Sequence, residues 1–145
     1  MAREYFHTTS YALSIGTTIK RGTYLSDALH DSAYVRDDPL QEFLRERIRH
    51  SFFPSKPSRF NASYVFENQE DAVTFRDQLH PSRRIYKVSF ADPNAPTHRV
   101  CYTAWNSVQT NMEQAAYDYW SNPINYSSGG SEVFAESDLV VLAEA

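Results

Sequence analysis

The segment at residues 61–90, NASYVFENQEDAVTFRDQLHPSRRIYKVSF, decides the fold class of this chain. Residues 61–66 hold a valine between two aromatic residues and predict a strand. Asn68 is a helix-capping residue, and apolar residues at helical spacing follow it up to His80-Pro81, which ends the helix. Residues 84–90 then alternate between polar and apolar side chains, as a half-buried strand does. A strand, a helix and a second strand therefore follow one another directly.

The sequence on either side adds elements of both kinds. Residues 4–8 predict a first strand, and residues 9–20 predict a loop or a short helix that leads to Gly16. Further strands are predicted at residues 98–104, 131–134 and 138–143. Because strands and helices do not follow one another in regular βαβ units, the order predicts an α+β fold.

Two more helices are indicated by capping residues and helical periodicity. Asp38 and Pro39 begin one of them, which ends before Pro54 and separates apolar from charged residues. We expect its apolar face to enter the core; that face carries Leu40, Phe43, Leu44 and Ile48. We expect its charged face in solvent; that face carries Glu42, Arg45, Glu46, Arg47 and Arg49. A capping box from Thr110 to Glu113 begins the other helix, which has Tyr119 and Trp120 on its apolar face.

Length and composition limit the classes of protein to consider. A chain of 145 residues, 41% of them hydrophobic, is expected to form one domain over residues 1–145. The net charge of -4 argues against a general polyanion binder, so contact with nucleic acid would need a local basic patch. The single cysteine, Cys101, cannot form an internal disulfide, and no apolar stretch reaches about 18 residues. We expect no membrane span and a cytoplasmic location, in the producing cell or in a target cell.

Three short motifs, far apart in the sequence, carry residues suited to chemistry: Phe6-His7-Thr8-Thr9, Ser63-Tyr64-Val65-Phe66 and Ser131-Glu132-Val133. His7 at a strand end is suited to donate to a ligand hydroxyl, and Tyr64 or Phe66 to stack on a planar ring. Glu132 follows a Gly-Gly-Ser turn and would supply a carboxylate. Each also has a plain structural interpretation: a backbone-bonded histidine, two core rings and a solvated glutamate.

Arg59 lies between a Ser-Pro loop and the strand that carries the rings, where a guanidinium is able to bind a phosphate through two hydrogen bonds. The other basic residues nearby are interpreted as a solvated, partly paired helix face, with a nucleic-acid patch as the alternative. The sequence has no Walker-type loop, no Gly-x-Ser-x-Gly motif, no dinucleotide glycine fingerprint and no Cys/His metal pattern. We therefore expect no kinase, no hydrolase of that type and no metal.

Taken together, the three motifs resemble the His-Tyr-Glu signature of ADP-ribosyltransferases of the diphtheria-toxin and poly(ADP-ribose) polymerase type. The resemblance extends over about residues 5–142. It implies a split, mixed or antiparallel β-sheet core with about three flanking helices. It also implies a small bacterial or phage protein, such as an effector or toxin.

The resemblance further implies a reaction, in which the nicotinamide–ribose bond of NAD is cleaved and ADP-ribose passes to a macromolecular acceptor, protein or nucleic acid. His7 would hold the adenosine-side ribose, the backbone of Thr8 the nicotinamide amide, and Glu132 an oxocarbenium-like transition state. The implied catalytic residues are His7, Tyr64 and Glu132. The implied NAD-binding residues are His7, Thr8, Thr9, Arg59, Tyr64 and Phe66, with Tyr64 preferred over Phe66 as the ring that stacks on nicotinamide.

Two positions depart from the family's pattern. Thr8 stands where many members have glycine, and Gly130 stands where the arginine-modifying branch has an acidic or amide residue, which argues against arginine as the acceptor. The same fold could also serve as an NAD glycohydrolase, or as a catalytically silent module that binds protein or nucleic acid. An RNA 2′-phosphotransferase would need more basic residues around a phosphate than the sequence offers.

Overall fold

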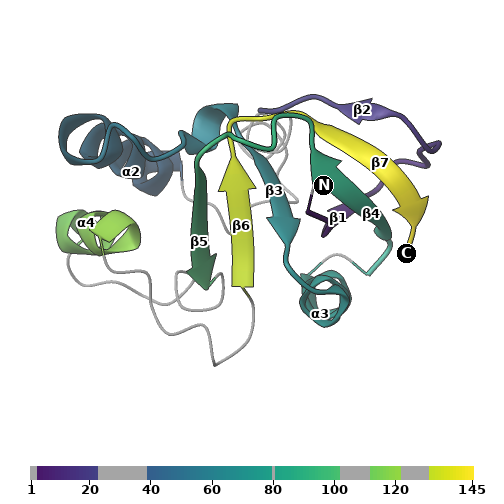
Figure 1. Ribbon diagram of the computed structural model, residues 1–145. Helices are drawn as coiled ribbons and strands as arrows, with labels where there is room; N and C mark the ends of the chain where they lie inside the picture. The colour runs from purple at the N-terminus through teal and green to yellow at the C-terminus, as the bar shows by residue number, and fades with distance from the viewer. Residues whose placement is uncertain (1–2, 23–38, 80, 102–111, 122–130) are drawn as a thin grey trace.

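The computed structural model describes residues 3–22, 39–79, 81–101, 112–121 and 131–145. Within these ranges the chain forms an antiparallel sheet of seven strands and three α-helices (Figure 1). The α+β class and the three helices confirm the sequence-based prediction. The strands are β1 (Tyr5–Thr9), β2 (Thr18–Ile19), β3 (Ser63–Phe66), β4 (Arg84–Phe90), β5 (Thr97–Cys101), β6 (Ser131–Ala135) and β7 (Leu139–Glu144). The helices are α2 (Pro39–Phe52), α3 (Gln69–Leu79) and α4 (Met112–Ser121), with a 3-10 turn, η2, at Arg59–Asn61.

The sheet consists of two halves that meet at a narrow junction. The strands lie in the order β2-β7-β4-β1-β3-β6-β5, and all neighbours are antiparallel. β1 pairs with β4 along its whole length, and β3 does the same with β6. Between β1 and β3, however, the register holds a single pair, Phe6 opposite Phe66. The junction therefore separates the half β2-β7-β4-β1 from the half β3-β6-β5.

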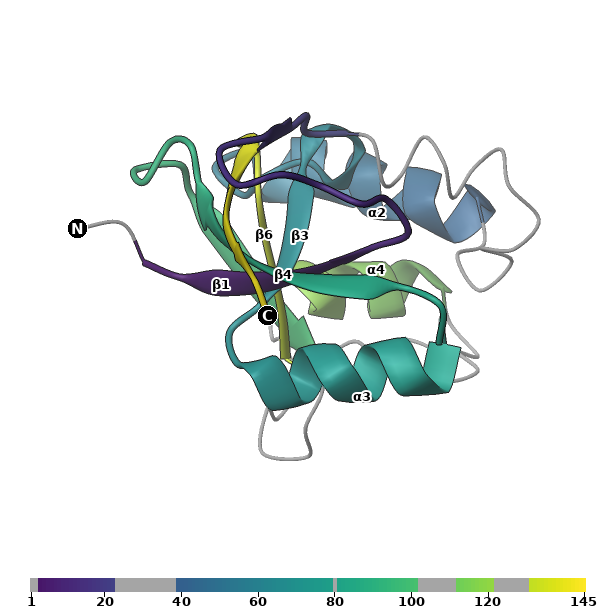
Figure 2. The same ribbon diagram turned by 90° about the vertical axis from the view of Figure 1, so that its right-hand side faces the viewer.

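The two faces of the sheet bury different residues, because successive side chains of a strand point to opposite faces. One face, which we call the helix face, is covered by the helices. On this face Tyr64 and Phe134 cluster with Tyr119 of α4, and Phe66 clusters with Phe75 of α3. Figures 1 and 2 show α3 apart from the α2–α4 pair. The opposite face buries a third cluster, which includes Tyr5, Val65 and Val133.

The segment between β1 and β2 lies along the edge of β7. Gly16, at a φ of +87°, forms a turn that glycine adopts without strain. The backbone amide of Gly16 donates to the carbonyl of Val141, and the amide of Val141 donates to the carbonyl of Thr17. These bonds align Thr18 with Val140. Of the two predictions for residues 9–20, the loop is therefore correct, and a short edge strand follows it.

The predicted start of α3 is confirmed in detail. The side-chain oxygen of Asn68 accepts a hydrogen bond from the backbone amide of Asp71 at 2.8 Å, as an N-cap does. The predicted strand at 84–90 has the bounds of β4. Tyr119 and Trp120 are buried in the core, as their helical spacing predicts. The predicted capping residue Thr110 lies outside the described residues.

The orientation of α2 corrects the sequence-based expectation. Glu42 and Arg45, expected in solvent, are 1% and 5% exposed, whereas Phe43, expected in the core, is 57% exposed. The reason is a cation from another segment. The guanidinium of Arg59, from η2, donates to both carboxylate oxygens of Glu42, the closest at 2.8 Å, and to the hydroxyl of Tyr119 at 2.7 Å.

Two buried arginines, Arg45 and Arg59, share the carboxylate of Glu42 in this network. Burial by itself would raise the pKa of Glu42, but the charges and hydrogen bonds of Arg59 and Arg45 outweigh it and lower that pKa. Arg45 also stands over the ring of Tyr119 at 4.7 Å, and its backbone carbonyl accepts from the indole of Trp120 at 2.9 Å. Ion pairing with Arg59 therefore draws charged residues of α2 inward, against α4.

Replacing Glu42 should show how much this network contributes to the stability of the fold. In Glu42→Gln the guanidinium of Arg59 stays buried without its counter-charge, so we expect the free energy of unfolding to fall by about 3–5 kcal/mol. Urea unfolding followed by circular dichroism measures this change. The matched control is Glu4→Gln, which breaks an exposed pair with Lys87 at 3.6 Å and should change stability by about 1 kcal/mol or less. Equal effects of the two substitutions would contradict the claim that the buried pair of Glu42 and Arg59 stabilises the fold more than an exposed pair does.

Candidate functional site

The three motifs lie on three neighbouring strands. His7 is on β1, Tyr64 and Phe66 are on β3, and Glu132 is on β6, and these strands are adjacent in the order β1-β3-β6. Phe66 pairs with Phe6 on one side and with Glu132 on the other. With about 4.8 Å between neighbouring strands, the Cα atoms of Phe6 and Glu132 are roughly 10 Å apart. The fold thus makes neighbours of strands that are far apart in the sequence. By alternation along β1, the His7 side chain lies on the face of Tyr86, opposite to that of Phe66 and Glu132.

His7 bridges the two halves of the sheet. Its Nδ1 lies 2.8 Å from the carbonyl oxygen of Tyr64, next to the single register pair of the junction. A carbonyl only accepts hydrogen bonds, so Nδ1 carries the proton and donates. Burial lowers the pKa of His7 to about 4; the bond to Tyr64 opposes this shift and the charge of Arg83 adds to it. The ring is therefore neutral at pH 7.

A neutral ring that donates through Nδ1 has a lone pair on Nε2. His7 is thus prepared to accept a hydrogen bond from a ligand hydroxyl. The sequence had suggested the reverse direction, with His7 as the donor. The bond to Tyr64 reverses it, because that bond uses the proton of the neutral ring.

Tyr64 contributes to this arrangement mainly through its backbone. Its ring is 5% exposed and packs at 5.3 Å against that of Phe134, and its hydroxyl donates to the carbonyl of Arg59 at 2.6 Å. Burial raises the pKa of Tyr64 well above its usual value. Stacking of Tyr64 on a nicotinamide stays a prediction. In the structure the ring belongs to the core, and the carbonyl orients His7.

Glu132 lies on the helix face at the boundary between two apolar clusters. It alternates with Phe134, which packs under α2 and α4, and it pairs across the strands with Phe66, which packs under α3. Burial raises the pKa of Tyr119 to about 12, and the negative charge of Glu132 contributes to this shift, as it does for Tyr64. Glu132 itself is partly buried.

Phe66 is the aromatic residue in the same cross-strand row as Glu132. Its ring is 3% exposed and lies 5.1 Å from that of Phe75 on α3. This places an apolar wall directly beside the strand position of the carboxylate.

Thr8 and Thr9, the other predicted residues of β1, pair with Ile85 and Arg84 of β4 and are both buried. The hydroxyl of Thr9 accepts from the amide of Tyr11 and so ends the strand in a turn. Their predicted contacts with NAD stay predictions.

Arg83 is a residue of this site that the sequence analysis missed. Its guanidinium lies 3.5 Å from the carbonyl oxygen of Thr8, and its charge acts on His7. A turn between α3 and β4 gives no sequence signal for such a role. Arg59, the predicted phosphate ligand, instead lies in the buried network with Glu42, and its phosphate role stays a prediction that would require it to exchange partners.

Metal sites and membrane-spanning helices are two further classes of feature, and both concern only residues 3–22, 39–79, 81–101, 112–121 and 131–145. No group of three His, Cys, Asp or Glu side chains there is placed to hold a metal ion. No helix in the same ranges combines the length and the apolar content needed to cross a membrane.

The chain belongs to the family DUF2441, whose description is "Protein of unknown function", and the match covers residues 8–144. The matched segment contains Tyr64, Phe66 and Glu132 and begins one residue after His7. No curated protein matches the chain.

The buried histidines make stability depend on pH. His98 resembles His7 in this respect: its Nε2 donates to the carbonyl of Tyr119 at 2.8 Å, and burial lowers its pKa to about 4. The unfolded chain takes up these protons near pH 6.5 and the folded chain only near pH 4. The free energy of unfolding should therefore fall as the pH drops through this window, by about 3 kcal/mol for each ring.

Urea unfolding at several pH values measures this loss, and NMR titration of the imidazole carbons assigns it. His7→Asn should remove the contribution of His7 to the pH dependence of the free energy of unfolding and should leave the contribution of His98. If either ring titrates near pH 6.5 in the folded protein, the burial argument is wrong for that ring.

Proposed function

We propose that this chain is an NAD-dependent mono-ADP-ribosyltransferase that cleaves the nicotinamide–ribose bond and transfers ADP-ribose to a macromolecular acceptor. The observation that carries the proposal is the arrangement of the three motifs. A neutral His7 and a partly buried Glu132 lie on strands that flank β3, at the junction of two half-sheets. The narrow junction also supports an ADP-ribosyltransferase type of split sheet.

Glu132 supplies the electrostatic part of the reaction. Positive charge develops on the sugar as nicotinamide leaves, and a fixed carboxylate stabilises that charge best where water is largely excluded. The partly buried position of Glu132 between two apolar clusters meets this requirement. Its carboxylate would accept a hydrogen bond from the nicotinamide-side ribose.

His7 and Arg83 supply the binding of the other half of NAD. The Nε2 lone pair of His7 accepts from a hydroxyl of the adenosine-side ribose, with the ring held by the Tyr64 carbonyl. Arg83 supplies a cation close to His7, and a guanidinium suits a pyrophosphate. We therefore assign to Arg83 the phosphate contact that the sequence suggested for Arg59.

Phe66 and Tyr64 have different roles in this proposal. Phe66, in the same row as Glu132, forms the apolar wall beside the nicotinamide. Tyr64 acts as a positioning residue through its carbonyl, because its ring and hydroxyl are bonded within the core.

Two alternatives use the same fold. An NAD glycohydrolase would need the same residues, with water as the acceptor. A silent module that binds nucleic acid through α2 is less well supported, because Arg45 is buried and Arg49 donates to Glu46 and to the carbonyl of Lys56. A bacterial or phage effector that acts in a cytoplasm fits the small domain.

Nicotinamide release tests the proposal directly. Purified protein incubated with NAD, with and without a cell lysate as the source of acceptor, should release nicotinamide. Glu132→Gln should lower the rate about 100- to 1000-fold, because it removes one preorganised charge. The control Glu144→Gln changes an exposed glutamate at the end of β7 and should leave the rate unchanged. Absence of release in the wild type under every condition would sink the enzymatic proposal.

Two adjacent arginines allow a matched test of the pyrophosphate contact. Arg83→Gln should raise KM for NAD about tenfold through the loss of a charge-assisted bond, with a smaller effect on kcat. Arg84→Gln removes the same charge one residue away, where the side chain is 52% exposed and 3.8 Å from Glu144, and should leave KM unchanged. Steady-state kinetics of both variants distinguish the two positions, and equal KM values would contradict the role of Arg83.

A further inference from the structure

A second polar hollow lies away from the site described above. It has a volume of about 270 Å³ and is lined by Arg3, Tyr5, Lys56, Thr97, His98, Arg99 and Val133. Val133 belongs to the cluster of the opposite face of the sheet, whereas its neighbour Glu132 lies on the helix face. Val133 and Tyr5 thus line the hollow from the face opposite to Glu132, and His98 and Lys56 line it at the outer strand β5.

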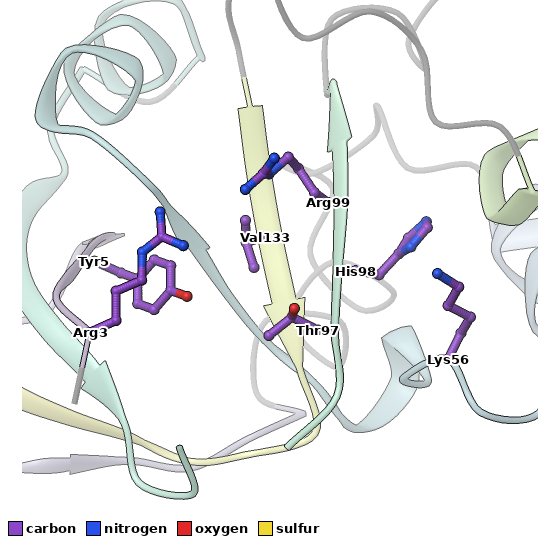
Figure 3. A pocket seen from close by; sticks show the side chains of 7 residues that line it. All are labelled: Arg3, Tyr5, Lys56, Thr97, His98, Arg99 and Val133. Atoms are coloured by element: carbon purple, nitrogen blue, oxygen red, sulfur yellow. The ribbon is translucent and has the colours of Figure 1, made fainter. Parts of the chain in front are cut away.

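Two arginines converge in this hollow from different strands. Figure 3 shows Arg3, which precedes β1, and Arg99, on β5, with Val133 of β6 between them. Their side chains are 59% and 46% exposed. The guanidinium of Arg3 stands over the ring of Tyr5 at 5.0 Å, in a cation–π contact.

One carboxylate of the protein already binds both arginines. The carboxylate of Glu67 accepts from Arg3 at 2.6 Å and from Arg99 at 2.8 Å. This geometry shows that the two guanidinium groups are spaced so that both can bind one anionic group. The same fork also matches the oxygens of a phosphate.

Charge balance favours a dianion over a second carboxylate. Arg3, Arg99 and Lys56 line the hollow as cations, and Glu67 supplies one negative charge. His98 is neutral at pH 7, because its pKa is about 4. Cations therefore outnumber carboxylates among these four charged residues, in a chain whose net charge is -4.

We propose that the Arg3–Arg99 hollow binds the phosphate group of a small phosphate monoester. Arg3 and Arg99 hold the phosphate oxygens, the hydroxyl of Thr97 donates beside them, and Lys56 attracts the dianion from the other side of β5 (Figure 3). Tyr5 and Val133 form the apolar floor on which the ester group lies. This site is independent of NAD turnover, so the failure of either proposal leaves the other intact.

Titration of the labelled protein with inorganic phosphate and with ribose 5-phosphate, followed by NMR, tests the proposal. The backbone amides of Arg99 and Val133 should shift with both ligands, with a dissociation constant of roughly 1 mM or below. A dithymidine phosphodiester, which carries one charge, should bind at least tenfold more weakly. Shifts with the diester alone would replace the monoester assignment by a nucleic-acid backbone. The absence of shifts at these amides with every ligand would overturn the site.

Substitutions in the hollow should change phosphate affinity in opposite directions. Arg99→Gln should weaken phosphate binding about tenfold or more, because it removes a charge-assisted contact. The matched control Arg84→Gln removes an exposed strand arginine paired with a glutamate elsewhere and should leave binding unchanged. Glu67→Gln removes the competing carboxylate and should tighten binding. Weaker binding in Glu67→Gln, or equal losses in Arg99→Gln and Arg84→Gln, would contradict the proposal.

Discussion

The bond between His7 and the carbonyl of Tyr64 is the contact on which the arrangement of this protein depends. It lies beside the single register pair that joins the two halves of the sheet, where the regular backbone ladder is at its shortest. The His7 side chain thus links β1 to β3 by a hydrogen bond, as backbone groups link neighbouring strands elsewhere in the sheet. The same bond fixes the tautomer of His7 and so decides which nitrogen faces a ligand. Architecture and proposed chemistry share one hydrogen bond.

The buried network around Arg59 extends this constraint into the helices. Tyr64 is held at both ends, by His7 at its carbonyl and by the carbonyl of Arg59 at its hydroxyl. Arg59 in turn is fixed by Glu42 of α2 and by Tyr119 of α4. Removing Glu42 would leave the guanidinium of Arg59 buried without its counter-charge. The helices therefore support the strand that positions His7, although they contribute no residue to the proposed NAD contacts.

Local patterns predicted those elements whose burial follows their own periodicity. β4 and the Asn68 cap are of this kind, because alternation and capping are recorded in neighbouring residues. The burial of Glu42 could not be predicted, because it depends on Arg59, which lies 17 residues away, and on α4. Likewise, motif order grouped the strands of His7 and Glu132. The order of the motifs did not indicate that the carbonyl of Tyr64 would bind His7 or that Arg83 would approach Thr8.

The central claim is that His7 and Glu132 hold the two riboses of one dinucleotide. A crystal structure of Glu132→Gln with NAD tests it most directly, since the slowed reaction preserves the bound molecule. The account predicts an adenosine-side ribose hydroxyl within hydrogen-bond distance of His7 Nε2, and the other ribose beside the side chain at position 132. NAD bound elsewhere, or with the His7 ring turned away from Tyr64, would contradict it.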